Sequence, residues 1–316
     1  MLTPVIPLTT RREADDSQTR CLGGESELRR SLRSYVIPVV DAVLRVRGSL
    51  TDEVPLRRNW IGPVKKGSNE GNPSSGIHSA EMRVDLMRTC LADHLAPSVA
   101  RASATVLRRA GVEVRVPKGQ TCCGQPAWSV GLPDEARPVA RRTLRAFAGE
   151  DPVVVPSGSC AAMVRHGYPE LFRGTPDEAA AADLAGRTVE LSQFLHAHGV
   201  APPAAVAGSV TYHDSCHMLR VLGERESPRA VLASIEGLEL REMEATDVCC
   251  GFGGSFSVGF PEVSGRLGED KARHAAATGA DELIACDLSC LAHIAGRARR
   301  TGIPLRVRHL AELLAE

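Results

Sequence analysis

Eight of the ten cysteines in this 316-residue chain form a pattern that occurs twice. In each copy a single cysteine is followed by an adjacent pair with a glycine behind it, and then by a second single cysteine. The first copy comprises Cys90, Cys122, Cys123 and Cys160, and the second comprises Cys216, Cys249, Cys250 and Cys290. The second copy is nearly the first moved along the chain by one constant step, which indicates an internal duplication. Cysteines that repeat as a set are typical of metal ligands.

Four thiolates per copy match the ligand count of a [4Fe-4S] cluster. Structural zinc sites usually take their ligands as two close pairs such as C-x2-C, whereas here long gaps separate each single cysteine from the pair. Two neighbouring cysteines bind one ion only with strain, but they can reach different irons of a polynuclear cluster. We therefore predict one or two iron-sulfur clusters with these eight cysteines as ligands. A zinc-stabilised binding module is the alternative from another class, and a thiol oxidoreductase that cycles the vicinal pairs through a disulfide ranks third.

Glycines next to the cysteine pairs are predicted to support the sites. Gly124 and Gly251 follow the two pairs, where a residue without Cβ lets the backbone turn sharply and point its N–H group at cluster sulfur. The second copy continues to Gly253 and Gly254. This run is not the dinucleotide-binding fingerprint, which should follow a strand directly and open a helix.

Two histidines and two further cysteines remain to be assigned. His213 and His217 flank Cys216, and we place both histidines around the site and outside the ligand set, because a structural histidine near a site is more common than a ligand. Cys21 and Cys286 are expected to be spare thiols, although Cys286 could serve as a labile extra ligand. The sequence offers no catalytic residue, so we expect a subunit that is not catalytic alone.

Composition restricts the class of protein. A hydrophobic content of 43% is enough for a core, and the balance of 38 basic against 38 acidic residues favours neither nucleic acid nor an anionic membrane as a partner. No apolar run is long enough to span a membrane, and the N-terminus lacks the apolar core of a secretory signal. We therefore expect a cytoplasmic protein, in which cysteines serve metal or redox chemistry more often than structural disulfides.

Short apolar runs alternate with helix-period segments from Met82 onward. The runs predict strands at 82–86, 112–116, 153–155, 210–212, 238–240, 283–285 and 305–307. The segments between them predict helices at about 92–110, 134–148, 188–199, 228–236, 260–279 and 290–300. Strands that alternate with helices imply βαβ units and a mainly parallel sheet.

The expected fold is α/β, with two duplicated Rossmann-like halves at 82–205 and 206–316. Each single cysteine falls just after a predicted strand and before a helix, at the carboxyl edge of the sheet where ligands bind in open α/β folds. Cysteines far apart in sequence can therefore meet there. Residues 1–81 differ from the rest and end in a Gly/Ser/Asn-rich linker at 67–76, so we expect a poorly ordered extension.

The repeated Cys-Cys-Gly pattern resembles the CCG family of cysteine-rich proteins. That family includes the cysteine-rich subunit of heterodisulfide reductase, the iron-sulfur subunits of glycolate oxidase and anaerobic glycerol-3-phosphate dehydrogenase, and the lactate-utilisation protein A group. The last group is the most similar, and the resemblance covers about residues 82–316. It is carried by the segments 121–127, 156–160, 249–258 and 287–290.

The resemblance implies an iron-sulfur electron-transfer subunit of a complex that oxidises L-lactate to pyruvate. It also implies two companions, a ferredoxin-type iron-sulfur subunit and a third subunit. The general family motif ends in C-x-x-C, but Ser157 stands at the first of these positions here, so an ordinary four-ligand cluster is the expectation. Members of the lactate group start near Met82, which suggests that the start codon of this chain is assigned too far upstream.

Overall fold

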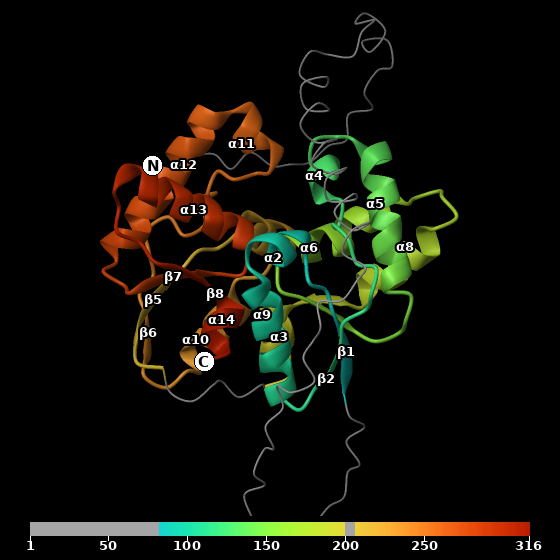
Figure 1. Cartoon of the computed structure of the whole chain (residues 1–316), viewed down its shortest axis with the longest axis horizontal. Coiled ribbons are helices and arrows are strands. Elements are labelled where there is room, and N and C mark those ends of the chain that lie inside the picture. The colour runs from blue at the N-terminus through green and yellow to red at the C-terminus, as the bar shows by residue number, and fades with distance from the viewer. Residues whose placement is uncertain (1–81, 200–205) are drawn as a thin grey trace, which may run out of the picture.

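The computed structural model describes residues 82–199 and 206–316, which form two four-stranded sheets (Figure 1). The first sheet has the order β2-β1-β3-β4 and the second has the order β6-β5-β7-β8. The strands are β1 (Arg83–Leu86), β2 (Glu113–Arg115), β3 (Val153–Val155), β4 (Thr188–Glu190), β5 (Gly208–Tyr212), β6 (Leu238–Leu240), β7 (Glu282–Ala285) and β8 (Val307–His309). Every strand pair is parallel, which confirms the predicted duplicated α/β fold.

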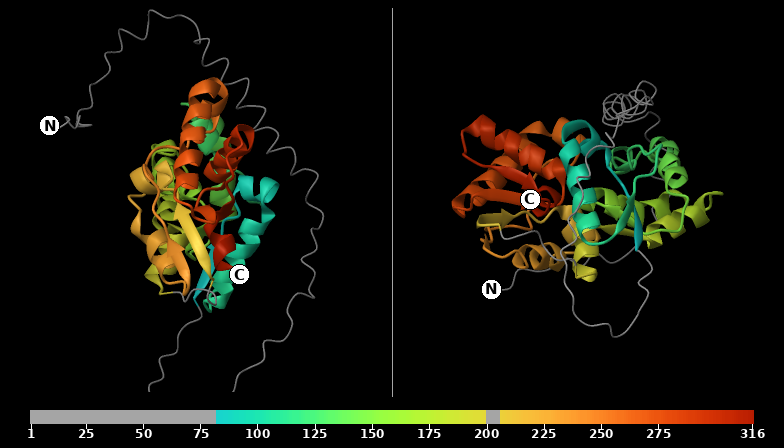
Figure 2. Two further views of the ribbon diagram at one scale, coloured as in Figure 1. Left: turned by 90° about the vertical axis from the view of Figure 1, so that its left-hand side faces the viewer. Right: turned by 60° about the horizontal axis from the view of Figure 1, so that its bottom comes forward.

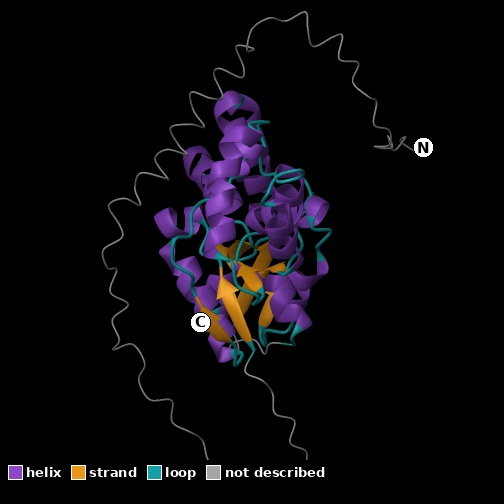
Figure 3. Ribbon diagram, turned by 90° about the vertical axis from the view of Figure 1, so that its right-hand side faces the viewer, coloured by secondary structure: helices purple, strands orange, loops and turns teal. Residues whose placement is uncertain are grey.

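Helices connect the strands in both halves. The first half contains α2 (Cys90–Leu95), α3 (Pro97–Arg109), α4 (Gln125–Trp128), α5 (Pro133–Ala146), α6 (Gly158–Ala162), the π-helix η3 (Met163–Gly167), α7 (Tyr168–Leu171), α8 (Glu178–Gly186) and α9 (Leu191–Ala197). The second half contains the π-helix η4 (His217–Val221), α10 (Glu226–Ala233), α11 (Ser255–Gly259), α12 (Pro261–Ala277), α13 (Leu288–Thr301) and α14 (Leu310–Leu314). Figure 3 shows the strands inside the molecule with helices around them.

Alternate residues of the inner strands β3 and β7 enter two different cores, as the side-chain period of a strand requires. In the first sheet Val84 and Val154 face a core that both halves share, whereas Val153 and Val155 face a core of the first half alone. In the second sheet Ile284 faces the shared core, and its neighbours on β7 face a core of the second half. The buried cysteines of each set belong to these two separate cores, not to the shared one.

The two halves pack through reciprocal helix pairs. Helix α3, which follows β1, packs against α14, and α10, which follows β5, packs against α9. These four helices lie between the sheets in Figure 1, and the right-hand view of Figure 2 shows the α2–α3 segment at the junction of the halves. Helices α9 and α14 each begin directly after the edge strand with a capping box, formed by Glu190 and His309. The halves are therefore related by an approximate two-fold axis.

Several predicted elements differ in detail from the observed ones. The predicted helix 92–110 is divided at Ala96, because Pro97 begins a new helix. The predicted helix 188–199 is strand β4 followed by α9, separated by the capping box at Glu190. Strand β8 starts at Val307, later than predicted, because Gly302 ends α13 in the left-handed region and residues 303–306 form an irregular connection.

The described residues contain no helix that is both long and apolar enough to cross a membrane. The predicted extension at 1–81 and its linker lie outside the described residues. The predicted boundary between 82–205 and 206–316 falls at residues 200–205, which are also outside them.

Candidate metal centres

The first four cysteines meet at the carboxyl edge of three adjacent strands, β2, β1 and β3. Cys90 is the first residue of α2, Cys122 and Cys123 lie in the loop before α4, and Cys160 lies within α6. The Sγ atoms of Cys123 and Cys160 are 3.5 Å apart. The Cys122 thiol hydrogen-bonds with the thiols of Cys123 and Cys90, so the four sulfur atoms form one continuous group.

The second four cysteines form the corresponding group at β6, β5 and β7. Cys216 caps η4, Cys249 and Cys250 lie in the loop before α11, and Cys290 lies in the first turn of α13. The Cys249 thiol interacts with those of Cys216 and Cys250, and the Cys250 thiol interacts with that of Cys290. The predicted placement at the strand edge is thus confirmed, with the difference that Cys90, Cys160 and Cys290 lie inside helices instead of before them.

Both groups are mostly buried but have one accessible side. Cys122, Cys123 and Cys160 are buried, and Cys90 is half-buried. In the second group Cys250 and Cys290 are buried, whereas Cys216 and Cys249 are half-buried. Each centre therefore has a protected side within its core and a side closer to solvent.

Contact between thiols makes the first cysteine of each pair the most acidic. Hydrogen bonds from Cys216 and Cys250 lower the pKa of Cys249 to about 2, and hydrogen bonds from Cys123 and Cys90 lower the pKa of Cys122 well below its usual value. The four donating thiols have pKa values above the usual range, so they keep their protons unless a cation compensates the charge. All of these thiols can ionise together only if a cation lies between them and compensates their charge. This behaviour is typical of cysteines that bind a metal.

The glycine behind each pair is required by the backbone and by packing. Gly124 has φ 90° and Gly251 has φ 88°, in the left-handed region that disfavours side chains. The Gly124 N–H donates to Cys122 Sγ at 3.5 Å, and the Gly251 N–H donates to Cys249 Sγ at 3.3 Å. A Cβ on Gly251 would lie 2.5 Å from the Ser264 carbonyl oxygen, so helix α12 leaves no room for a side chain there.

The other predicted glycines shape the loop that leads into α11. Gly253 has φ 51°, and a Cβ on it would lie 2.8 Å from Cβ of Phe256. Gly254 has φ 60° and caps α11. Both glycines let the chain reverse direction immediately after the second cysteine pair.

The two predicted histidines occupy different positions. His213 is fully buried, and its ring lies in a group with the Cys250 and Cys290 sulfurs whose ligand atoms are all within 4.8 Å of one another. His217 is half-buried, with Nδ1 3.6 Å from Cys216 Sγ. The Gln125 amide donates to His217 Nε2 at 2.6 Å, which connects the loop behind the first cysteine pair to the second centre.

A buried carboxylate joins the halves between the two centres. Asp287 Oδ1 accepts hydrogen bonds from the hydroxyls of Ser157 and Ser159, each at 2.8 Å, and from the Ser159 N–H at 3.1 Å. Its Oδ2 accepts from the Ser215 hydroxyl at 2.5 Å. Sequence reasoning missed this network, although Ser157 and Asp287 stand at the same distance before Cys160 and Cys290 and so mark equivalent positions of the repeat.

Further side chains hold the loops that carry the pairs. In the first half the Tyr168 hydroxyl donates to the Cys123 carbonyl at 2.9 Å. In the second half the buried Lys271 ammonium donates to the carbonyls of Ala245 and Thr246, just before the pair. Burial lowers the pKa of Lys271, and nearby Cys250 acts in the opposite direction. The loop positions are thus fixed from outside the cysteine sets.

Cys286 does not belong to the second set. It faces the shared core with 1% exposure, where the Tyr212 hydroxyl donates to its Sγ at 3.3 Å. Its neighbour Ala285 faces the core that contains Cys290, and successive strand residues point to opposite sides of the sheet. The expectation of a spare thiol fits this position, whereas that of an extra ligand does not. Cys21 lies outside the described residues.

The donor chemistry of both sets fits an iron-sulfur cluster. Each set offers four thiols linked one to the next by contacts between sulfur atoms, with a backbone N–H already directed at one of the sulfurs. A single tetrahedral ion would use neighbouring cysteines in a strained arrangement, whereas several metal atoms can use them separately.

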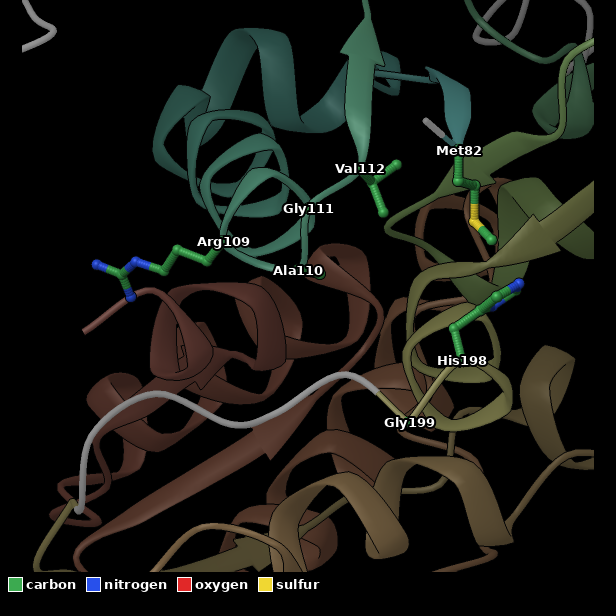
Figure 4. Close-up of a pocket in the computed structure, with 7 residues that line it drawn as sticks. All are labelled: Met82, Arg109, Ala110, Gly111, Val112, His198 and Gly199. Carbon is green, nitrogen blue, oxygen red and sulfur yellow. The ribbon is translucent and has the colours of Figure 1, made fainter. Parts of the chain in front are cut away.

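A surface hollow lies at the opposite edge of the first sheet and takes no part in these centres (Figure 4). Its lining residues come from the amino end of β1, the turn between α3 and β2, and the end of α9: Met82, Arg109, Ala110, Gly111, Val112, His198 and Gly199. It contains no cysteine.

Comparison with known proteins agrees with the geometry. The family model "CCG: Cysteine-rich domain" matches residues 84–165 and 210–295, one segment in each half. The chain is 45% identical to lactate utilization protein A of Geobacillus thermodenitrificans over 238 residues, covering 74% of this chain and 98% of that protein. It is 45% identical over 236 residues to the protein of the same name from Shouchella clausii, with the same coverage. It is 41% identical over 238 residues to lactate utilization protein A 2 of a Bacillus cereus strain, again covering 74% and 98%. The chain therefore belongs to the CCG family of cysteine-rich proteins, in the lactate utilization protein A group.

Proposed function

We propose that this chain is an iron-sulfur electron-transfer subunit of a complex that oxidises lactate to pyruvate. Each half holds one [4Fe-4S] cluster through its four cysteines. The observation that carries the proposal is the gathering of eight cysteines from distant loops into two continuous groups of sulfur atoms. The names of the relatives supply the link to lactate.

A cluster bound at these positions would accept and release electrons one at a time. The residues of the chain hold it, exclude water on its buried side and tune it through the N–H groups of Gly124 and Gly251. The half-buried side, at Cys90 in the first half and at Cys216 and Cys249 in the second, is the side from which electrons would reach a partner. No residue is assigned to the oxidation of lactate itself.

The partners in this proposal are a ferredoxin-type iron-sulfur subunit and a third subunit. Removal of two electrons from a hydroxy acid needs an acceptor, and the sequence carries no flavin or nicotinamide fingerprint. The chain therefore relays electrons between companions. Complexes that act on glycolate, glycerol-3-phosphate or a heterodisulfide use related subunits, but the relatives named above favour lactate.

The test is metal and sulfide analysis of protein purified without oxygen. We expect a brown protein with a broad visible absorption shoulder, equal amounts of iron and acid-labile sulfide, and a spin-resonance signal after reduction. The Cys286→Ser variant is the control, because this thiol lies in the shared core and should not alter iron content. A colourless protein that contains zinc and no sulfide would replace the proposal with the zinc-stabilised module, and a metal-free protein whose pairs form disulfides would favour thiol exchange.

A further inference from the structure

His213 is a fully buried histidine whose ring nitrogens make no hydrogen bond of normal geometry. Its exposure is 0%, and neither Nδ1 nor Nε2 makes a hydrogen bond of normal geometry with any described residue, although the ring lies close enough to the Cys290 thiol to interact with it. A buried polar group left without a partner destabilises the folded state, because its hydration is lost and not replaced. Buried histidine nitrogens are normally satisfied by protein or solvent. The ring nitrogens of His213 therefore lack the hydrogen bonds that buried imidazoles normally make, and the nearby Cys290 thiol is only a weak partner.

The missing partner lies on the side of the second cysteine set. The His213 ring nitrogen and the sulfurs of Cys250 and Cys290 all lie within 4.8 Å of one another, close enough to bind one metal ion together. All three residues are buried, so the ligand atoms converge in the interior. Cys250 and Cys290 are already two of the four cysteines assigned to that centre.

The first half has no counterpart to this imidazole. The backbone N–H of His213 donates to the Ile284 carbonyl at 2.9 Å, and the backbone N–H of Met87 donates to the Val154 carbonyl at 2.9 Å. Each of the two residues directly follows the strand that begins its half, β5 or β1. His213 and Met87 are thus equivalent in the repeat. Met87 is buried in the core that contains Cys122 and Cys123, where its thioether is a poorer donor than an imidazole nitrogen for iron or zinc.

We infer that His213 supplies an imidazole nitrogen ligand to the second centre, which makes the two centres chemically different. The first centre is held by thiolates alone, whereas the second is held by thiolates together with one neutral nitrogen donor. The inference rests on the proposed function only in taking the metal to be iron, because imidazole binds zinc as well. Coordination would satisfy one of the two ring nitrogens, neither of which makes a hydrogen bond of normal geometry in the fold.

The decisive experiment measures nitrogen hyperfine coupling in the reduced, unmodified protein. Electron-nuclear double resonance is recorded on samples with natural histidine and with 15N-labelled histidine. We expect one strongly coupled nitrogen whose frequency changes with the isotope, because a nitrogen bound directly to iron shares its unpaired spin. A cluster signal without such a coupling would overturn the inference and leave the proposed function intact.

Three variants assign the nitrogen to a residue. His213→Gln, which keeps the side chain polar and of similar size, should abolish the coupling, and Met87→His should introduce a second coupling in the first centre. His217→Ala is the matched control, because His217 is a neighbouring histidine that already has Gln125 as a partner. Loss of the coupling in His217→Ala, or its persistence in His213→Gln, would contradict the assignment.

A protein that contains zinc in place of iron would still decide the question. X-ray absorption at the zinc edge distinguishes imidazole from purely sulfur coordination. Imidazole scattering that disappears in His213→Gln would support the ligand and refute the iron-sulfur function, and a zinc centre with sulfur alone would refute both.

Discussion

The two halves of this molecule share a strand order and four cysteine positions, but they surround their cysteines differently. The first pair is supported by the Tyr168 hydroxyl and faces Met87, whereas the second is supported by the Lys271 ammonium and faces His213. The backbone bonds that place Met87 and His213 are the same in both halves. The comparison teaches that duplication of a fold preserves where ligands stand, while the side chains around them are free to diverge and give each centre its own chemistry.

The largest effect is expected from removing one buried ligand in either half. Cys160→Ser and Cys290→Ser should each lose about half of the bound iron and sulfide, because each half builds its own set. The readout is iron and sulfide per chain beside a spin-resonance spectrum of the remaining centre. Complete loss of both centres in either variant would show that the two halves bind metal as a unit, and would contradict the view that each half builds its own centre.

Replacing the glycine behind each cysteine pair with alanine should lower the free energy of unfolding by different amounts in the two halves. Both glycines have positive φ, which disfavours alanine by about 1–2 kcal/mol. Gly251→Ala adds a contact of 2.5 Å with the Ser264 carbonyl, whereas Gly124→Ala adds one of 3.2 Å with the Ala136 carbonyl. We expect losses of roughly 3–4 kcal/mol for Gly251→Ala and about 1–2 kcal/mol for Gly124→Ala in the free energy of unfolding. Equal losses in denaturant titrations would contradict the difference in packing.

The helix caps Glu190 and His309 predict a difference in pH dependence between equivalent positions. Burial raises the pKa of Glu190 to about 7 from an ordinary value of 4.5, and burial lowers the pKa of His309. The unfolded chain releases the Glu190 proton first, so this residue lowers stability as pH rises from about 4.5 to 7. His309 acts in the opposite sense, because the unfolded chain binds its proton first as pH falls below 6.5.

Glu190→Gln tests this difference. The glutamine of the variant does not titrate, so the variant avoids the loss of stability that ionisation of Glu190 causes in the unmodified protein. The free energy of unfolding of the variant minus that of the unmodified protein should therefore be larger at pH 8 than at pH 5, by up to about 3 kcal/mol, because burial raises the pKa of Glu190. The measurement is the difference in the free energy of unfolding between the two proteins at each pH, so that contributions common to both cancel. A difference that does not change with pH would show that Glu190 titrates normally in the folded state.

The smallest expected effect concerns the contact between the halves. Ser159→Ala removes a hydroxyl that donates to Asp287 Oδ1 across the interface, and should cost about 1.5 kcal/mol in the free energy of unfolding. Ser129→Ala is the matched control, since its hydroxyl donates to a carbonyl within the first half at an exposed position. A loss no larger than that of the control would show that Asp287 is satisfied without Ser159.

The sequence alone determined the ligand pattern, the duplication and the parallel α/β fold. Cysteine spacing and the alternation of strands with helices are local properties, and parallel strands bring their carboxyl ends to one edge wherever they pair. For the same reason the glycines behind the pairs could be assigned from the sequence, because a sharp turn at a ligand needs a residue without Cβ.

Only the tertiary structure decided which side chains meet across the fold. Whether Cys286 joined Cys290 depended on which side of β7 each residue faces. The Asp287 network depended on the approximate two-fold packing of the halves, which brings Ser159 beside a residue more than a hundred positions away. The isolation of His213 also depended on it, since a residue's hydrogen-bond partners are set by long-range packing that no local pattern encodes.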